Sequence, residues 1–168
     1  MTVEKWYRKF AITTIAMGII TLLLSAPAWS DDDRRAATPY QQEIHVGILA
    51  GAGEGFAFSP QIPSGMRLII EHISAFASLP QGQRASEIYV TTTAAGSNIH
   101  HDIFLTYEAS ASGYDTLAFT DPAKLYADPD SYVSIGVFLN SLAGPSDVWV
   151  KISGKLVPCD SHGNCSVD

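Results

Sequence analysis

The chain is poor in positive charge and in cysteine. Its 168 residues include ten Lys and Arg against 17 Asp and Glu, which gives a net charge of −7, and only two cysteines, both near the C-terminal end. The negative balance argues against a nucleic-acid partner, because phosphate backbones repel an acidic chain, and against binding to anionic membrane surfaces. The simplest role of this charge is solubility of the folded domain.

Only one long hydrophobic run is present, at residues 11–24, between a short basic segment and a small-residue stretch that ends at Ala28. This order is typical of a secretory signal peptide with an A-x-A cleavage site at Ala26 and Ala28. A retained membrane anchor is the alternative, since residues 11–29 are about long enough to span a bilayer. However, three aspartates follow the run, whereas a stop-transfer helix is more often followed by Lys or Arg.

Cleavage after residue 28 leaves 140 residues and moves the net charge from −7 to −9, because three basic residues and one acid are removed. That length fits one domain with its own core. We therefore predict a signal peptide at residues 1–28, a flexible leader at 29–39, a folded domain at 40–157 and a tail at 158–168. The protein is expected to be exported to the periplasm or outside the cell, without stable membrane insertion after cleavage.

Helical periodicity is absent after residue 40, where short β-branched and aromatic runs alternate with turn residues. This pattern is typical of strands. The predicted strands cover residues 42–49, 56–58, 67–77, 87–93, 99–108, 114–120, 124–127, 132–139 and 148–157. Strands at this spacing without crossover helices predict an all-β fold, an antiparallel β-sandwich of about eight strands.

We prefer a jelly-roll-like topology among the Greek-key sandwiches. The I-P-S-G turn at residues 62–65 precedes a long apolar strand, and the closing strand ends in I-S-G-K-L-V at residues 152–157. In these features the chain resembles many small secreted jelly-roll domains. Such a resemblance concerns the fold and does not assign a function.

Several large aromatic residues are expected on the outer faces of the sandwich, because alternate residues of a strand point to opposite faces. If Val148, Val150 and Ile152 point inward, Trp149 points outward. Ordinary packing under loops is one interpretation of these residues. The other is an exposed aromatic patch for binding or self-association, with the candidate ligand-binding residues Tyr107, Tyr132, Phe138 and Trp149.

Catalytic signatures are weak. No G-x-S-x-G elbow is present, and the glycine-rich stretch at 51–55 is followed by F-A-F-S-P, which cannot begin the helix that a phosphate loop needs. His100, His101 and Asp102 are the most suggestive triplet, and the carboxylates of nearby strands could join them. Adjacent strand residues face opposite ways, however, so both histidines cannot bind one metal unless the strand bulges.

Metal sites are also weakly supported. His72 could in principle join His100 or His101, but no H-x-H motif is present. Asp121, Asp128 and Asp130 could offer oxygen ligands to calcium, although the prolines beside them make turn formation the simpler explanation. We predict no metal and no cofactor.

The two cysteines, Cys159 and Cys165, follow the last predicted strand. In an exported protein, oxidation to a disulfide is the expected state, and Gly163-Asn164 can reverse the chain between them. A zinc site that includes His162 is the alternative, but it has only three ligands.

The sequence therefore favours a small exported, non-catalytic binding or assembly module whose partner is a carbohydrate or a protein surface. The alternative is a secreted hydrolase that uses the region His100–Asp102 together with strand carboxylates. The ligand and the oligomeric state do not follow from the sequence.

Overall fold

The structure is a computed structural model of the chain. The structure describes residues 37–160 and 164–165. The predicted signal peptide and most of the predicted leader lie outside these residues. Over the described ranges no helix is long and apolar enough to cross a membrane.

The described residues form nine strands in two antiparallel sheets, which confirms the predicted all-β sandwich. The strands are β1 (Thr38–Ile48), β2 (Glu54–Phe58), β3 (Met66–Pro80), β4 (Ala85–Ala94), β5 (Ser97–Asp102), β6 (Thr106–Ala111), β7 (Tyr114–Ala127), β8 (Ser134–Leu139) and β9 (Ser146–Pro158). The domain therefore begins and ends in strands at residues 38 and 158, slightly beyond the predicted bounds of 40 and 157.

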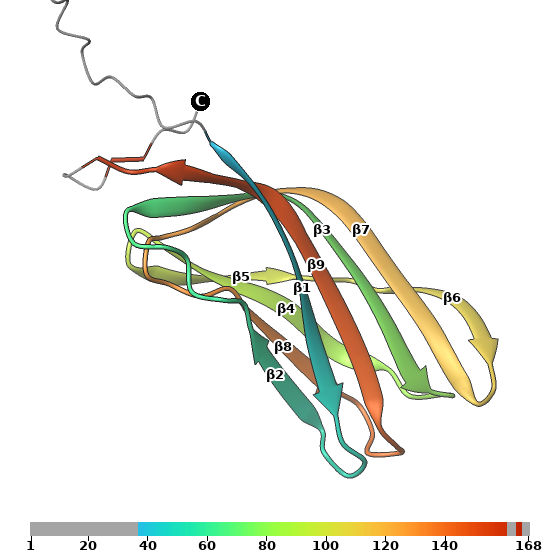
Figure 1. The fold of residues 1–168 in the computed structure, drawn as a ribbon. Helices are drawn as coiled ribbons and strands as arrows, with labels where there is room; N and C mark the ends of the chain where they lie inside the picture. Colours follow the sequence, from blue (N-terminus) through green and yellow to red (C-terminus); the bar gives the residue numbers. More distant parts are fainter. Residues whose placement is uncertain (1–36, 161–163, 166–168) are drawn as a thin grey trace, which may run out of the picture. The chain divides into compact units, whose positions relative to one another are not determined.

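The strand order is that of a jelly roll. The five-stranded sheet runs β1-β9-β3-β7-β6 and the four-stranded sheet runs β2-β8-β4-β5 (Figure 1). The chain passes from one sheet to the other between β1 and β2, β2 and β3, β3 and β4, β5 and β6, β7 and β8, and β8 and β9. Strand β6 is an addition at the edge of the five-stranded sheet, where it forms a hairpin with β7.

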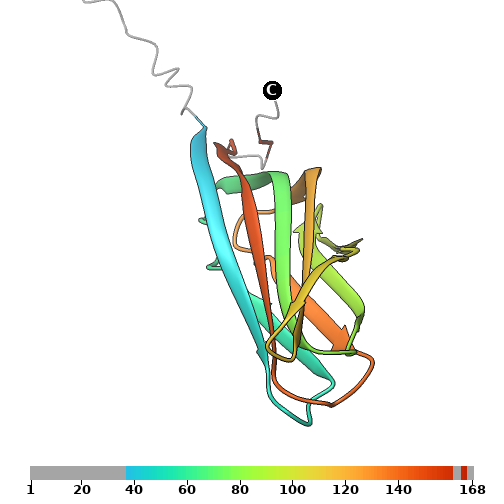
Figure 2. The same cartoon turned by 90° about the vertical axis from the view of Figure 1, so that its right-hand side faces the viewer.

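The core lies between the two sheets, which Figure 2 shows from the side. The predicted inward residues Val148, Val150 and Ile152 of β9 are at most 1% exposed, and they meet Ile135 and Val137 of β8 in the same core. The period-2 alternation that predicted these faces therefore holds for the central strands of both sheets.

Two hairpins close on two-residue turns with positive φ at both positions. Ala95 and Gly96 connect β4 to β5 with φ of 51° and 73°, and Ser112 and Gly113 connect β6 to β7 with φ of 54° and 83°. These values belong to turns whose twist matches that of the flanking strands. Both turns lie in the gaps between the strands predicted at residues 87–93, 99–108 and 114–120.

The prediction of a single strand at residues 99–108 was wrong. The chain leaves the four-stranded sheet after Asp102 and enters the five-stranded sheet at Thr106. Ile103 is 4% exposed and Leu105 packs against the core, so the inward alternation continues through the crossing. This is why periodicity did not reveal the break.

The prediction of two strands at 114–120 and 124–127 was also wrong, because β7 is continuous through Asp121 and Pro122. Strand β6 pairs with β7 between Tyr114 and Ala118, so no strand of the described residues pairs with β7 on this side at Pro122. A proline removes no ladder hydrogen bond at such an edge. A register shift in β3 between Ile70 and His72 lies opposite this stretch.

Candidate functional site

The four aromatic residues predicted to bind a ligand do not come together. Trp149 lies on the outer face of the five-stranded sheet, whereas Phe138 lies on the outer face of the four-stranded sheet. Tyr107 is on the edge strand β6 and Tyr132 is in the loop before β8, with exposed fractions of 52% and 48%. The outward direction predicted for Trp149 and Phe138 is confirmed, but the four residues form no single plane.

Trp149 is the centre of an aromatic row that crosses three strands. It lies opposite His45 of β1 and Phe76 of β3 in the strand register. The ring centroids of His45 and Trp149 are 5.0 Å apart at an interplanar angle of 14°, and those of Phe76 and Trp149 are 5.6 Å apart at 46°. His45 therefore covers one side of the indole, and Phe76 on the other strand is 44% exposed.

A histidine–carboxylate pair lies at the same place. His45 Nε2 is 2.7 Å from Asp147 Oδ1, and both side chains are nearly half exposed. The sequence did not reveal this pair, because 102 residues separate its members. The alternation of β1 and β9 predicted that both strands existed, but it did not predict their register.

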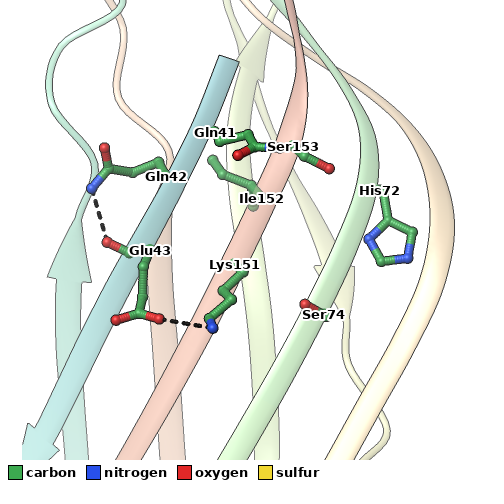
Figure 3. Close-up of a pocket in the computed structure, with 8 residues that line it drawn as sticks. All are labelled: Gln41, Gln42, Glu43, His72, Ser74, Lys151, Ile152 and Ser153. Carbon is green, nitrogen blue, oxygen red and sulfur yellow. Dashed lines mark hydrogen bonds and ion pairs between the residues drawn. The ribbon is translucent and has the colours of Figure 1, made fainter. Parts of the chain in front are cut away.

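Polar residues continue this face in two further rows. Glu43, Lys151 and Ser74 form the row next to the aromatic one, and Gln41, Ser153 and His72 form the row after it. They line a shallow groove of about 360 Å³ (Figure 3). We call this surface the polar groove. It offers hydroxyl, amide, carboxylate, ammonium and imidazole groups from β1, β9 and β3.

The charges of the polar groove compensate one another. Lys151 Nζ lies 3.2 Å from Glu43 Oε2. His72 Nε2 is in hydrogen-bond contact with Thr120 Oγ1 at 3.1 Å. These contacts leave a groove that carries many hydrogen-bonding groups and one compensated pair of charges, Glu43 and Lys151.

The outer face of the four-stranded sheet carries a second aromatic group, of which only Phe138 was among the predicted ligand-binding residues. Phe138 contacts Phe56 edge to face with centroids 5.7 Å apart, and it contacts Tyr89 at 6.1 Å. Gly136 lies between Phe56 and Tyr89 in the register, and a Cβ atom there would lie 2.4 Å from Cζ of Tyr89. The glycine thus makes the space in which the Tyr89 ring lies over β8.

The region His100–Asp102 does not assemble with the other histidines. His100 Nδ1 is in hydrogen-bond contact with Thr91 Oγ1 at 3.0 Å, and its ring packs edge to face on Tyr89. His101 lies opposite Val90 and therefore faces the other side of the strand, as the alternation predicted. His72 belongs to the other sheet, so the three histidines that could have formed one site are separated.

The loop aspartates have structural partners. Asp128 Oδ1 accepts a hydrogen bond from Arg67 at 3.0 Å, and Asp128 Oδ2 accepts one from the Gly96 N–H at 3.2 Å. Asp130 Oδ2 accepts a hydrogen bond from the Ser64 hydroxyl. Among the residues that the structure describes, no three His, Cys, Asp or Glu side chains gather as a metal site.

Cys159 and Cys165 form the predicted disulfide, with an S–S distance of 2.02 Å. Both sulfur atoms are therefore unavailable to zinc. The two residues also form an isolated antiparallel bridge, and the Cys159 N–H donates a hydrogen bond to the Gly65 carbonyl at 2.8 Å. The disulfide thus lies beside the turn that precedes β3.

The fold and these surfaces define the class of protein as a jelly-roll sandwich whose two outer faces both carry aromatic and polar side chains. No protein-family model matches the sequence, and no curated protein matches it either. The two outer faces are therefore the features of the molecule that indicate a function.

Proposed function

We propose that this protein is an exported, non-catalytic binding module that holds a neutral glycan in the polar groove of the five-stranded sheet. The observation that carries the proposal is the junction of the aromatic row with the groove. Residues two apart in a strand lie about 7 Å apart on one face. The three rows therefore form one continuous surface from His45, Trp149 and Phe76 to Gln41, Ser153 and His72.

The chemistry of this surface suits a sugar. A glycan presents C–H faces that pack against aromatic rings, and hydroxyl groups that need both donors and acceptors. Phe76 and the exposed part of Trp149 offer the apolar contact, and the adjoining row offers the Glu43 carboxylate and the Lys151 ammonium group. Because these charges are already paired, a neutral ligand fits better than a charged one.

Export agrees with the disulfide, since oxidised cysteine pairs persist outside the cytoplasm. The predicted signal peptide at residues 1–28 remains a prediction. The hydrolase alternative gains little support from the geometry, because His100 contacts Thr91 and Tyr89 rather than a carboxylate.

An array of neutral oligosaccharides, probed with residues 29–168, tests the proposal. For any glycan that binds the parent protein, Trp149→Ala should weaken the affinity by about tenfold or more, because a central aromatic contact is lost. Lys151→Gln, a milder change of an exposed residue, should weaken it less. Tyr107→Ala is the matched control, since it removes an exposed aromatic side chain that belongs to the edge strand β6 and does not line the groove.

Two outcomes would contradict the proposal. One is that no neutral glycan binds above background. The other is that a bound glycan is retained equally by the Trp149→Ala, Lys151→Gln and parent proteins.

A further inference from the structure

The outer face of the four-stranded sheet carries an aromatic surface that nothing in the described part of the chain covers fully. Four aromatic side chains form it, and we call it the phenylalanine face: Phe56, Phe58, Tyr89 and Phe138. Phe56 and Phe58 are 52% and 66% exposed. Contiguous exposed aromatic surface of this kind marks binding sites, whereas scattered single residues do not.

The strand register places the rings next to one another. Phe56 and Tyr89 lie on either side of Gly136, and Phe138 is two residues along β8 on the same face. The ring contacts of Phe138 with Phe56 and with Tyr89 join β2, β8 and β4 into one surface. These rings are held by the sheet, so a partner would meet a preformed surface.

The charges on this face are all of one sign. Glu54 and Glu87 lie opposite Phe138 on its two sides, and Asp102 lies opposite Tyr89. No Lys or Arg occurs in β2, β4, β5 or β8. Over residues 37–160 and 164–165, these three carboxylates have no hydrogen-bond or ion-pair partner, whereas Glu43 in the polar groove and Asp147 beside the aromatic row do.

A recess of about 400 Å³ adjoins the phenylalanine face at the beginning of β4. Glu87 and Asp102 line it together with Phe104, which is 77% exposed. Arg84 also lines the recess, but its guanidinium is engaged by Asp115 at 3.0 Å. The recess therefore combines two unpaired carboxylates with an exposed aromatic ring.

We infer that the phenylalanine face docks an extended, Lys- or Arg-bearing segment of a partner protein. Aromatic rings attract a cationic side chain that lies over them, and nearby carboxylates strengthen this attraction and fix the register of the segment. The three carboxylates favour a basic segment over other partners, whereas an apolar face without charges would bind any apolar partner. The site is on the opposite sheet from the polar groove, and so it does not depend on the proposed glycan site.

Binding of two synthetic peptides tests the inference. One peptide alternates Gly and Arg, and the other alternates Gly and Gln; fluorescence anisotropy is measured with residues 29–168 at low and at physiological salt. We expect binding of the arginine peptide only, with an affinity that falls as salt rises. The variant Glu54→Gln/Glu87→Gln should weaken it by about tenfold, because both carboxylates beside Phe138 are neutralised.

Matched control variants distinguish binding at the phenylalanine face from a general attraction of the peptide to the acidic chain. Glu108→Gln/Asp121→Asn removes the same charge from exposed residues outside the four-stranded sheet, and it should change affinity by less than about twofold. Phe138→Leu should weaken binding several-fold, whereas Phe76→Leu on the opposite sheet should not. Circular dichroism verifies that each variant is folded.

Three results would overturn the inference. The first is no binding of the arginine peptide up to about 1 mM. The second is equal weakening by the two acid double variants, which would mean that only net charge matters. The third is a homodimer in sedimentation velocity that Phe56→Ser dissociates, which would assign this face to a second copy of the chain. The Trp149→Ala substitution lies on the opposite sheet. It should therefore leave peptide binding unchanged even where it abolishes glycan binding.

Discussion

The carboxylate of Asp115 pairs with the guanidinium of Arg84 at 3.0 Å, although 31 residues separate them. Asp115 is buried at the start of β7, with 5% of its side chain exposed. It also accepts hydrogen bonds from the Ser110 hydroxyl and from the Gly82 N–H. One carboxylate thus holds the turn between β3 and β4 against the hairpin of β6 and β7.

The stability of the fold should depend on the ionisation of Asp115. Hydrogen bonds from Ser110 first, then from Gly82 and Arg84, hold the pKa of Asp115 below its ordinary value. As pH falls, the unfolded chain therefore takes up this proton before the folded one does. The contribution of the Asp115 carboxylate to the free energy of unfolding is fully present above the ordinary Asp pKa of about 3.9. It is lost as pH falls through the lowered pKa of the folded state.

Asp115→Asn should accordingly lower the thermal unfolding temperature at pH 7. It should also make that temperature fall less steeply as pH decreases below about 4. Thermal unfolding followed by circular dichroism from neutral to acidic pH measures both effects. Asp121→Asn, at an exposed position of the same strand, is the control and should behave like the parent. If the unfolding temperature of Asp115→Asn fell at acidic pH as steeply as that of the parent, the carboxylate would not contribute to stability.

Gly154 should tolerate no side chain. A Cβ atom there would lie 1.9 Å from the carbonyl oxygen of Ile69, where β9 passes the irregular stretch of β3. Because the obstacle is backbone, Gly154→Ala should destabilise the fold by about 3 kcal/mol or more, measured by urea unfolding. Gly47→Ala is the matched control in the same sheet, since its Cβ would meet only ordinary contacts at 3.6 Å and beyond. Equal stability of the two variants would contradict this account.

The disulfide should matter little to the stability of the sandwich. Closing a loop with a sequence separation of six residues is worth about 2 kcal/mol in the chain-entropy model. Cys159 and Cys165 lie beyond the end of β9, so their bond restrains the tail more than the core. Cys159→Ser/Cys165→Ser should cost less than about 2 kcal/mol in urea unfolding.

A thiol titration of the denatured, unreduced parent protein accompanies this measurement. It should find no free thiol, and two free thiols would show that the bond does not form. Global unfolding of the double variant would show that the tail contributes to the core.

The sequence predicted the sheets better than the site, and the reason is physical. Alternation is a local property, so residues such as Val148 and Val150 could be assigned to the core from β9 alone. The pairing of His45 with Asp147 depends on strand register, which is set between distant segments. Phe56 and Phe58 were visible as alternate residues of one short strand, but their proximity to Tyr89 was not.

The errors in the strand assignment have a similar origin. Ile103 and Leu105 keep the alternation of a continuous strand while the chain crosses between sheets. Pro122 suggested a break, but it lies where, within the described part of the chain, β7 pairs with a strand on one side only. In both cases the deciding fact is the position of a neighbouring strand, and no local pattern contains it.

The jelly roll turns its two outer faces away from each other, with the core of about 10 Å between the sheets. A ligand on one face therefore leaves the other face open. A single small domain of this kind can join two different molecules and hold them at a fixed, short separation. If both proposed sites are occupied at once, the protein acts as a rigid spacer between a glycan surface and a basic protein.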